Sequence, residues 1–346
     1  MTCSHRATCT ALACACAIVV SPAAQAPTRR PAERLDAIAT VFDAFRTHAV
    51  VALGEGPHGN EQAHAFRLAL LRDPRFADTV NDIVVESGSA NDQAVADRFV
   101  RGEDVPPNAL RDLLEQSAGA APAWERPIYV EFFQAVRDVN RSRPADRKLR
   151  VLLGDPPIDW SLVKTPADYR PWGLQRDSHP AALIQREVLA RSRKALVIYG
   201  DGHFQARRER PGRSLVGFLE TAGTPVFIIT STFVDLARFE PAVASWRAPA
   251  AAMLQGTTIG AAPYEEFFGP APPTDFFRAN PRLEDHYDAV IWLGPSSSRT
   301  MSPILYPRCA EPDYVAMRVG RMVATGLPPT VRERLAQECL SAKPQP

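Results

Sequence analysis

The architecture of this chain can be read from one stretch of its sequence, Val50-Val51-Ala52-Leu53-Gly54-Glu55-Gly56-Pro57-His58. A continuous apolar run such as residues 50–53 is typical of a strand that is covered on both faces, as in a parallel sheet. The glycines that follow allow the backbone to turn tightly and expose Glu55 and His58. A second stretch has the same order of strand, glycine, acid, glycine and histidine: Leu196-Val197-Ile198-Tyr199-Gly200-Asp201-Gly202-His203. We therefore expect two strand ends to bring a histidine each to one edge of a sheet.

Strands and helices alternate along the chain. Short apolar runs predict strands at Ala49–Leu53, Asp82–Val85, Leu149–Leu153, Ala195–Tyr199, Pro225–Ile229 and Tyr287–Leu293. Helical patterns lie at Asn60–Arg72, Asn91–Arg101, Glu125–Asn140, Ala181–Arg193 and Val331–Leu340. This alternation predicts an α/β fold with a mainly parallel central sheet flanked by helices. The Pro-, Ala- and Phe-rich stretch Glu240–Arg282 has weak periodicity, so we expect either loops and short helices that cover a site or a disordered insert.

A polar residue follows nearly every expected strand. The residues that share this position are Glu55, Glu86, Asp155, Asp201 and Thr230. In open α/β sheets ligands bind beyond the carboxyl ends of the strands. A sheet with only a structural role would not need this bias, so the sequence predicts a functional site at the carboxyl ends.

The beginning of the chain differs from the rest. Arg6 is followed by an apolar Ala/Cys-rich run, Ala7–Val20, and by Ser21-Pro22-Ala23-Ala24-Gln25-Ala26. A positive start, a short apolar stretch and an Ala-x-Ala ending predict a secretory signal that is cleaved after Ala26, and hence export to the periplasm or the exterior. An uncleaved membrane anchor is the alternative, but the run is shorter than the roughly 20 residues that a spanning helix needs. We expect residues 27–346 to form a single α/β domain with no membrane span.

Cleavage would leave only Cys309 and Cys339 of the six cysteines. In an exported protein such a pair predicts a disulfide, here between the last helix and the preceding loop, with two free thiols as the alternative. The chain has 40 basic and 39 acidic side chains, so it has no net field to attract nucleic acid or anionic lipid. The expected partner is a small-molecule substrate.

The segment Gly54-Glu55-Gly56-Pro57-His58-Gly59 matches the Gly-x-Gly-x-x-Gly pattern of dinucleotide-binding sites. Its chemistry argues against that function, because the Glu55 carboxylate would face the pyrophosphate. The acid expected about 20 residues further on is displaced to Glu86. An exported protein also rarely has a nicotinamide cofactor available.

His58 is the candidate general base, since an imidazole with a pKa near 6.5 transfers protons readily close to neutral pH. Glu55 or Glu86 could orient its ring and stabilise the imidazolium. The alternative for His58 is a capping role at the start of the Asn60 helix. Glu86 could likewise cap a helix, and His203 could be an ordinary loop histidine.

Three further residues are candidates for substrate binding. Arg67 could pair with a site carboxylate or merely cover the surface of its helix. Asp155 follows a strand, and Arg176, with Asp177, is expected just before the Ala181 helix. Neither a Gly-x-Ser-x-Gly elbow nor an HExxH motif occurs, although His58, Glu86 and His203 are a reasonable ligand set for zinc or manganese.

These motifs resemble those of a known superfamily. Gly54-Glu55-x-x-His58-Gly59, Arg67 in the next helix and Glu86 after the next strand are similar in order and spacing to the erythromycin esterases. Gly200-Asp201-Gly202-His203 resembles the second motif of the related ChaN-like haem-uptake and Tiki proteins, and Tyr287-Asp288-Ala289-Val290-Ile291 resembles the last strand of the superfamily.

The resemblance implies a mixed α/β sheet with its site at the strand ends. In the esterases the residue that matches His58 activates water without a metal, and those that match Glu55, Glu86 and Arg67 position it. The relatives with two Gly-x-x-His motifs are associated with haem binding or metal-dependent peptide cleavage. The esterases carry a histidine where this chain has Gly200, which argues against macrolide lactones as the substrate.

Two functional hypotheses follow. The first is an exported hydrolase of esters or lactones without a cofactor, in which His58, Glu55, Glu86 and His203 are catalytic. The second is a ChaN- or Tiki-like protein that binds haem or a divalent metal through His58, His203 or Tyr199.

Overall fold

The computed structural model describes residues 28–205, 213–269, 280–304 and 306–341. The expected signal segment, residues 1–26, lies outside the described part. A single sheet of seven strands runs through the molecule in the order β3-β2-β4-β1-β5-β7-β6. The strands are β1 (Val50–Gly54), β2 (Asp82–Ser89), β3 (Arg150–Asp155), β4 (Ala195–Tyr199), β5 (Val226–Thr232), β6 (Ala250–Met253) and β7 (Ala289–Trp292).

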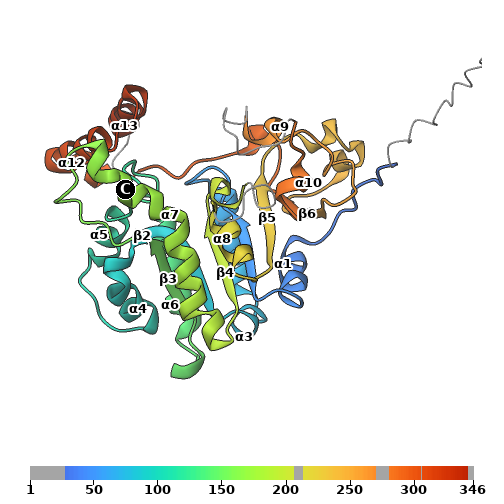
Figure 1. Cartoon of the computed structure of the whole chain (residues 1–346), viewed down its shortest axis with the longest axis horizontal. Helices are drawn as coiled ribbons and strands as arrows, with labels where there is room; N and C mark the ends of the chain where they lie inside the picture. The colour runs from blue at the N-terminus through green and yellow to red at the C-terminus, as the bar shows by residue number, and fades with distance from the viewer. Residues whose placement is uncertain (1–27, 206–212, 270–279, 305, 342–346) are drawn as a thin grey trace, which may run out of the picture.

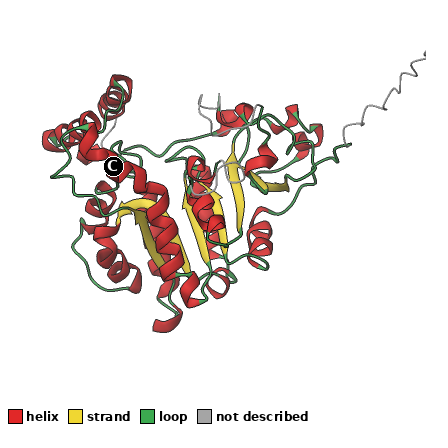
Figure 2. Ribbon diagram, viewed as in Figure 1, coloured by secondary structure: helices red, strands yellow, loops and turns green. Residues whose placement is uncertain are grey.

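The sheet is parallel apart from β6, which pairs with β7 in the antiparallel direction at one edge. Helices cover both of its faces (Figures 1 and 2), which confirms the expected α/β fold with a mainly parallel sheet. The helices are α1 (Ala37–Phe45), α2 (Glu61–Arg72), α3 (Phe76–Thr79), α4 (Gln93–Arg101), α5 (Ala109–Glu115), α6 (Pro127–Asn140), α7 (Pro166–Glu187), α8 (Leu215–Thr221), α9 (Glu265–Phe268), α10 (Leu283–His286), α11 (Tyr306–Cys309), α12 (Pro312–Ala324) and α13 (Pro329–Ser341).

Successive strand residues point to opposite faces and enter two separate cores. In β1, Val51 and Leu53 pack with α1, α2, α4 and α6, whereas Val50 and Ala52 pack with α7 and α8. Every residue of β1 is buried. Strands that are covered on both faces must be apolar at every position, which explains why they read as continuous apolar runs.

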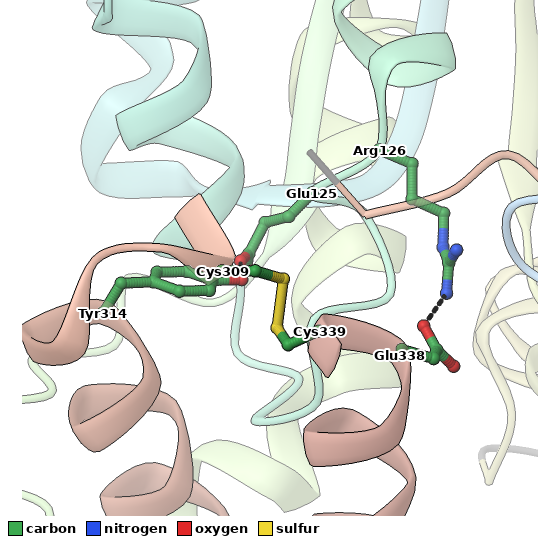
Figure 3. The surroundings of a disulfide bond; sticks show 6 residues. All are labelled: Glu125, Arg126, Cys309, Tyr314, Glu338 and Cys339. Carbon is green, nitrogen blue, oxygen red and sulfur yellow. Dashed lines mark hydrogen bonds and ion pairs between the residues drawn. A yellow bond between two sulfur atoms is a disulfide. The ribbon is translucent and has the colours of Figure 1, made fainter. Parts of the chain in front are cut away.

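A third, smaller core joins the C-terminal helices to the rest of the molecule. It contains Trp160, Met322 and Leu335, with Cys309 and Cys339 packed against it. These two cysteines form a disulfide with Cα atoms 5.0 Å apart (Figure 3), so the expected pairing is confirmed. No helix in the described part of the chain is long and apolar enough to cross a bilayer.

The structure corrects the bounds of one helix. Of the helix expected at Ala181–Arg193 only the part up to Glu187 is confirmed, since α7 begins at Pro166 and ends at Glu187. Thr165 and Asp168 form a capping box at its start, and Pro166 occupies the first turn, where a missing N–H costs nothing. Two interior prolines and an exposed, polar first half hide this helix from a search for apolar periodicity. Arg176 and Asp177 therefore lie within a helix instead of before one.

Two strand assignments also change. β2 continues to Ser89, so Glu86 lies inside the strand and does not follow it. The pairing of β2 with β3 shifts register between Val85 and Ser89, and such irregularities often redirect a side chain next to a functional site. The expectation of only loops and short helices in Glu240–Arg282 missed β6, whose four residues are too few for a clear pattern.

Candidate functional site

The strand order brings both histidine motifs and Glu86 to one place. β4 lies between β1 and β2, with Tyr199 beside Gly54 and Ile198 beside Val85. The segments that follow β1 and β4 therefore lie side by side at the site. Glu55 N–H donates to the Tyr199 carbonyl at 2.8 Å and extends this ladder by one residue.

The turn after β1 is closed by Asn60. Its side-chain oxygen accepts from Ala63 N–H at 2.7 Å and caps α2, which shows that the capping role considered for His58 was wrong. The Asn60 amide group also donates to the carbonyls of Glu55 at 3.0 Å and Pro57 at 2.7 Å. One buried amide thus joins the start of the helix to the turn that carries Glu55 and His58.

His58 is oriented by Glu55. His58 Nδ1 lies 2.7 Å from Glu55 Oε2, and Arg67 Nη1 lies 3.2 Å from Glu55 Oε1. Burial raises the pKa of Glu55, but the charge of Arg67 and the hydrogen bond from His58 outweigh it, so the net shift is downward. An ionised Glu55 accepts the Nδ1 proton, which leaves Nε2 as the basic nitrogen of neutral His58.

Burial also acts on His58 itself, lowering its pKa. The hydrogen bond and charge of Glu55, together with the charge of Glu86, outweigh burial and raise the pKa above 6.5. The second carboxylate is more distant, with Glu86 Oε2 4.0 Å from His58 Nε2. His58 therefore lies near both carboxylates that the sequence suggested, but it is hydrogen-bonded to only one of them among the described residues.

Glu86 is the centre of a second group of charges. Its Oε1 accepts from Arg176 Nη2 at 2.5 Å and lies 3.2 Å from His203 Nε2. Its Oε2 accepts from Gly200 N–H at 2.8 Å. Burial raises the pKa of Glu86, yet His203, His58 and Arg176 together hold it far below its usual range. Glu86 is thus a buried, ionised carboxylate.

His203 differs from His58 in having a carboxylate at each ring nitrogen. Nδ1 lies 2.8 Å from Asp177 Oδ1, and Nε2 faces Glu86. Burial opposes the charged ring, but Glu86 and Asp177 raise the pKa of His203 to about 10. His203 is therefore an imidazolium at neutral pH that donates two hydrogen bonds.

Arg176 links this group to β3. Its Nε donates to Asp155 Oδ1 at 3.1 Å, and Ala118 N–H donates to Asp155 Oδ2 at 2.7 Å. Asp155 is fully buried, and burial raises its pKa against the opposing charge of Arg176. Arg67 is also buried, at 5% exposure, and pairs with Glu55. The residues expected to bind substrate, Arg67, Asp155 and Arg176, thus each form an ion pair with a buried charge.

His58 also borders a pocket of about 700 Å³. His58, Gly200 and Asp201 line one part of it, and Phe267 and Phe268 of the stretch 240–282 line another. Glu55, Glu86, Arg67, Arg176 and His203 are not among its described lining residues. The site thus has two layers, a pocket bordered by His58 and a charged network behind it.

Asp201 and Thr230 take different places at the strand ends. Asp201 Oδ2 accepts from Gly56 N–H at 3.2 Å, and burial raises the pKa of Asp201 to about 7. Thr230 is fully buried within β5, where the residues that reach the pocket are Ser231 and Thr232.

His203, one of the residues expected to bind a metal or haem, already has a carboxylate at each ring nitrogen. Metal ligation needs a neutral imidazole, whereas both ring nitrogens of His203 donate to carboxylates. No group of three or more His, Cys, Asp or Glu side chains in the described part of the chain could hold a metal ion. Tyr199 is fully buried, and its hydroxyl lies where a side chain at Gly154 would be, so it does not face the pocket as a haem ligand would.

Sequence reasoning missed three residues that shape the site. Trp124 lies beside His58 with ring centroids 5.3 Å apart, and the Tyr129 hydroxyl accepts from Gly59 N–H at 2.9 Å. The third is Asn60, whose position before an apolar run is the usual signal for a helix cap. Trp124 and Tyr129 are brought in by the α6 region, and no local pattern points to them.

No family model matches the chain, and no curated protein matches it. Solved structures do match. A mutant of erythromycin esterase EreC in its open conformation has a TM-score of 0.52 at 12% identity, covering 80% of this chain and 99% of that one. A protein from Bacillus cereus has a TM-score of 0.52 at 10% identity, covering 80% and 97%.

ChaN of Campylobacter jejuni, solved with cofacially bound haem, has 12% identity and covers 58% of this chain and 88% of that one. Its TM-score of 0.38 is too low to support an argument about haem. Identities in this range establish the fold and leave the activity open. The resemblance indicated by the two histidine motifs is therefore confirmed at the level of the fold, which this chain shares with erythromycin esterase EreC.

Proposed function

We propose that this chain is a hydrolase that cleaves an ester or lactone with water activated by His58. The observation that carries the proposal is the state of the His58 ring. Glu55 holds Nδ1 at 2.7 Å, while Nε2 has no hydrogen-bond partner among the described residues, and His58 borders the pocket of about 700 Å³. An oriented imidazole with one free basic nitrogen beside a pocket is the arrangement that general-base catalysis requires.

In the proposed reaction His58 Nε2 accepts a proton from water as the water oxygen attacks the carbonyl carbon. The imidazolium that forms is stabilised by Glu55 in contact and by Glu86 at 4.0 Å. The C–O bond to the leaving oxygen then breaks, and the proton passes from His58 to that oxygen. Arg67 keeps Glu55 ionised, and Arg176 with His203 keeps Glu86 ionised, so these cations support the base without touching the substrate.

The pocket is consistent with a small organic substrate. Its volume lies in the range usual for small-molecule sites, and Phe267 and Phe268 offer an apolar wall for one half of an ester. A Cβ atom at Gly200 would lie 3.2 Å from His58 Cε1 and 3.3 Å from Glu86 Oε2. A histidine at this position, as in the esterases, would crowd His58, which supports a substrate other than a macrolide lactone.

The test is hydrolysis of a panel of p-nitrophenyl esters and lactones of increasing size by the wild type and two variants. His58→Ala should lower kcat/KM by at least about 100-fold, the usual contribution of a general base. His48→Ala is the matched control, because His48 precedes β1 and so lies at the amino ends of the parallel strands, away from the site at their carboxyl ends. Full hydrolysis by a folded His58→Ala protein would contradict the proposal.

We also propose that the mature protein is exported and begins after Ala26. The disulfide between Cys309 and Cys339 supports this, since disulfides persist mainly in oxidising compartments. The intact mass of the secreted protein tests it.

A further inference from the structure

A segment far from β1 in the sequence lies against the turn that carries His58. This segment, residues 298–302, is called the strap. Ser302 N–H donates to the Gly59 carbonyl at 2.8 Å, Glu61 N–H donates to the Thr300 carbonyl at 3.0 Å, and Met301 forms an antiparallel bridge with Asn60. The strap follows β7 and leads to the C-terminal helices, as Figure 1 shows in orange across the upper part of the molecule.

Arg126 joins the strap to the rest of the structure. It immediately precedes α6, and its side chain is 12% exposed. Nη1 donates to the Ser302 carbonyl, and Nη2 donates to Glu338 Oε2 at 2.9 Å (Figure 3). Because Glu338 precedes Cys339, one end of this connection is held by the Cys309–Cys339 disulfide.

The same side chain fills the space next to Gly59. A Cβ atom at Gly59 would lie 2.5 Å from Arg126 Cδ, and Gly59 has a φ of +83°, so both the space and the backbone require glycine. Gly59 is also held at both of its polar groups, its N–H by the Tyr129 hydroxyl and its carbonyl by Ser302. The residue that follows His58 is thus fixed on three sides.

We infer that Arg126 is a positioning residue for His58, acting through the strap and Gly59. The inference rests on the proposed hydrolase function for its effect on rate. Arg126 is not among the described residues that line the pocket, and its guanidinium reaches Ser302 and Glu338, so it acts on the backbone beside His58. Of the strap, only Arg299 is among the described lining residues. Displacement of a catalytic group by about 1 Å can cost about 100-fold in rate.

The first experiment compares Arg126→Ala, Arg126→Lys and a control on the same ester. Arg126→Ala should lower kcat by about 10- to 100-fold and raise KM by a smaller factor, because His58 carries the reaction whereas the strap contributes only Arg299 to the described pocket lining. Arg126→Lys retains a donor that can reach Ser302, so most of the lost kcat should return. A folded Arg126→Ala protein with a kcat within about 3-fold of the wild type would overturn the inference, as would a loss confined to KM.

The control is Arg143→Ala. Arg143 lies just beyond the other end of α6 and, like Arg126, donates to a backbone carbonyl and a carboxylate, here Ala77 and Asp78. Its side chain is 18% exposed, so the two substitutions remove similar contacts at opposite ends of one helix. An equal loss of kcat in Arg143→Ala would show a general structural effect and would also overturn the inference.

The second experiment needs no substrate. Hydrogen exchange of the amides in residues 58–63 should accelerate in Arg126→Ala and stay unchanged in Arg143→Ala, because only the first removes a hydrogen bond that holds the strap against the turn. Unchanged exchange in Arg126→Ala contradicts the inference even if the ester assay fails. Faster exchange in a protein whose wild type hydrolyses no ester would instead support the link to the His58 turn and refute the hydrolase function.

Discussion

His58 and His203 come from similar motifs but have opposite chemistry, because of the number of carboxylates each one meets. His203 donates to Asp177 and lies 3.2 Å from Glu86, which keeps it charged. His58 is hydrogen-bonded to Glu55 alone among the described residues, which leaves Nε2 without a hydrogen bond. Two histidines at the ends of neighbouring strands thus become a fixed cation and a candidate base.

The pKa of His58 leads to a prediction about pH dependence. A general base works in its unprotonated form, so kcat/KM should rise with pH through an apparent pKa above 6.5. Glu55→Gln keeps the hydrogen-bonding shape but removes the charge, so this apparent pKa should move down and the maximal rate should fall. The measurement is the pH–rate profile of both proteins. An unchanged apparent pKa in a folded Glu55→Gln variant would show that Glu55 does not set the ionisation of His58.

The sequence predicted which residues meet at the site better than it predicted their partners. Glu55, His58 and His203 were found because each stands at a strand end or next to a turn, and Glu86 was found because the apolar run of β2 ends just before it. Their partners were harder to assign. Arg67 pairs with a site carboxylate, Glu55, which was one of its two expected roles, whereas Asp155 and Arg176, expected to bind substrate, pair with each other. Burial decides between these roles, and burial depends on which helices pack over the strand ends.

At the scale of elements, the site is held together by the middle of α7, the segment after β4 and the start of α8. Asp177 of α7 accepts from His203 after β4 and from Leu215 N–H at 2.9 Å at the start of α8. The charged form of His203 is therefore part of the packing between these elements. Folding should accordingly be coupled to its protonation.

This coupling gives the second prediction. The folded-state pKa of His203 is about 10, above the value near 6.5 of an unfolded histidine, so the stabilisation is complete below pH 6.5 and is lost as pH rises toward 10. The free energy of unfolding should fall across this window by up to roughly 1.4 kcal/mol per pH unit more than in a His203→Gln variant. Urea titrations of both proteins from pH 6 to pH 10 test this. Parallel curves would mean that His203 is neutral in the folded protein.

The elements that sequence patterns predicted well are those with regular burial. The strands β1 and β4 lie within one residue of their expected bounds, because continuous burial demands continuous apolar sequence. The helix α7 was misplaced because its first half is mostly exposed and gives no apolar stripe. The strand β6 was missed because Ala250–Met253 is short and its pairing with β7 is a contact between distant segments.

For the whole molecule, the C-terminal helices depend on a small core and one covalent bond. The disulfide joins residues separated by 30 positions, and a loop of this length corresponds to about 3–4 kcal/mol of stabilisation in the chain-entropy account. We therefore predict that Cys309→Ser with Cys339→Ser lowers the free energy of unfolding by up to about 3–4 kcal/mol. Urea unfolding with and without reductant checks this, and the double variant, as the control, should not respond to reductant.

The edge strand β6 lies under a segment near the start of the described chain. Leu35 exchanges both of its backbone hydrogen bonds with Ala251, at 2.8 and 3.0 Å, and Arg30 forms a bridge with Thr257. An uncovered edge strand is a template for pairing with another copy. Processing after Ala26 would preserve this cover, whereas a cut beyond Leu35 would expose the backbone of β6. If the proposed signal is removed, the position of the cut therefore bears on whether the mature protein stays dispersed or self-associates into aggregates.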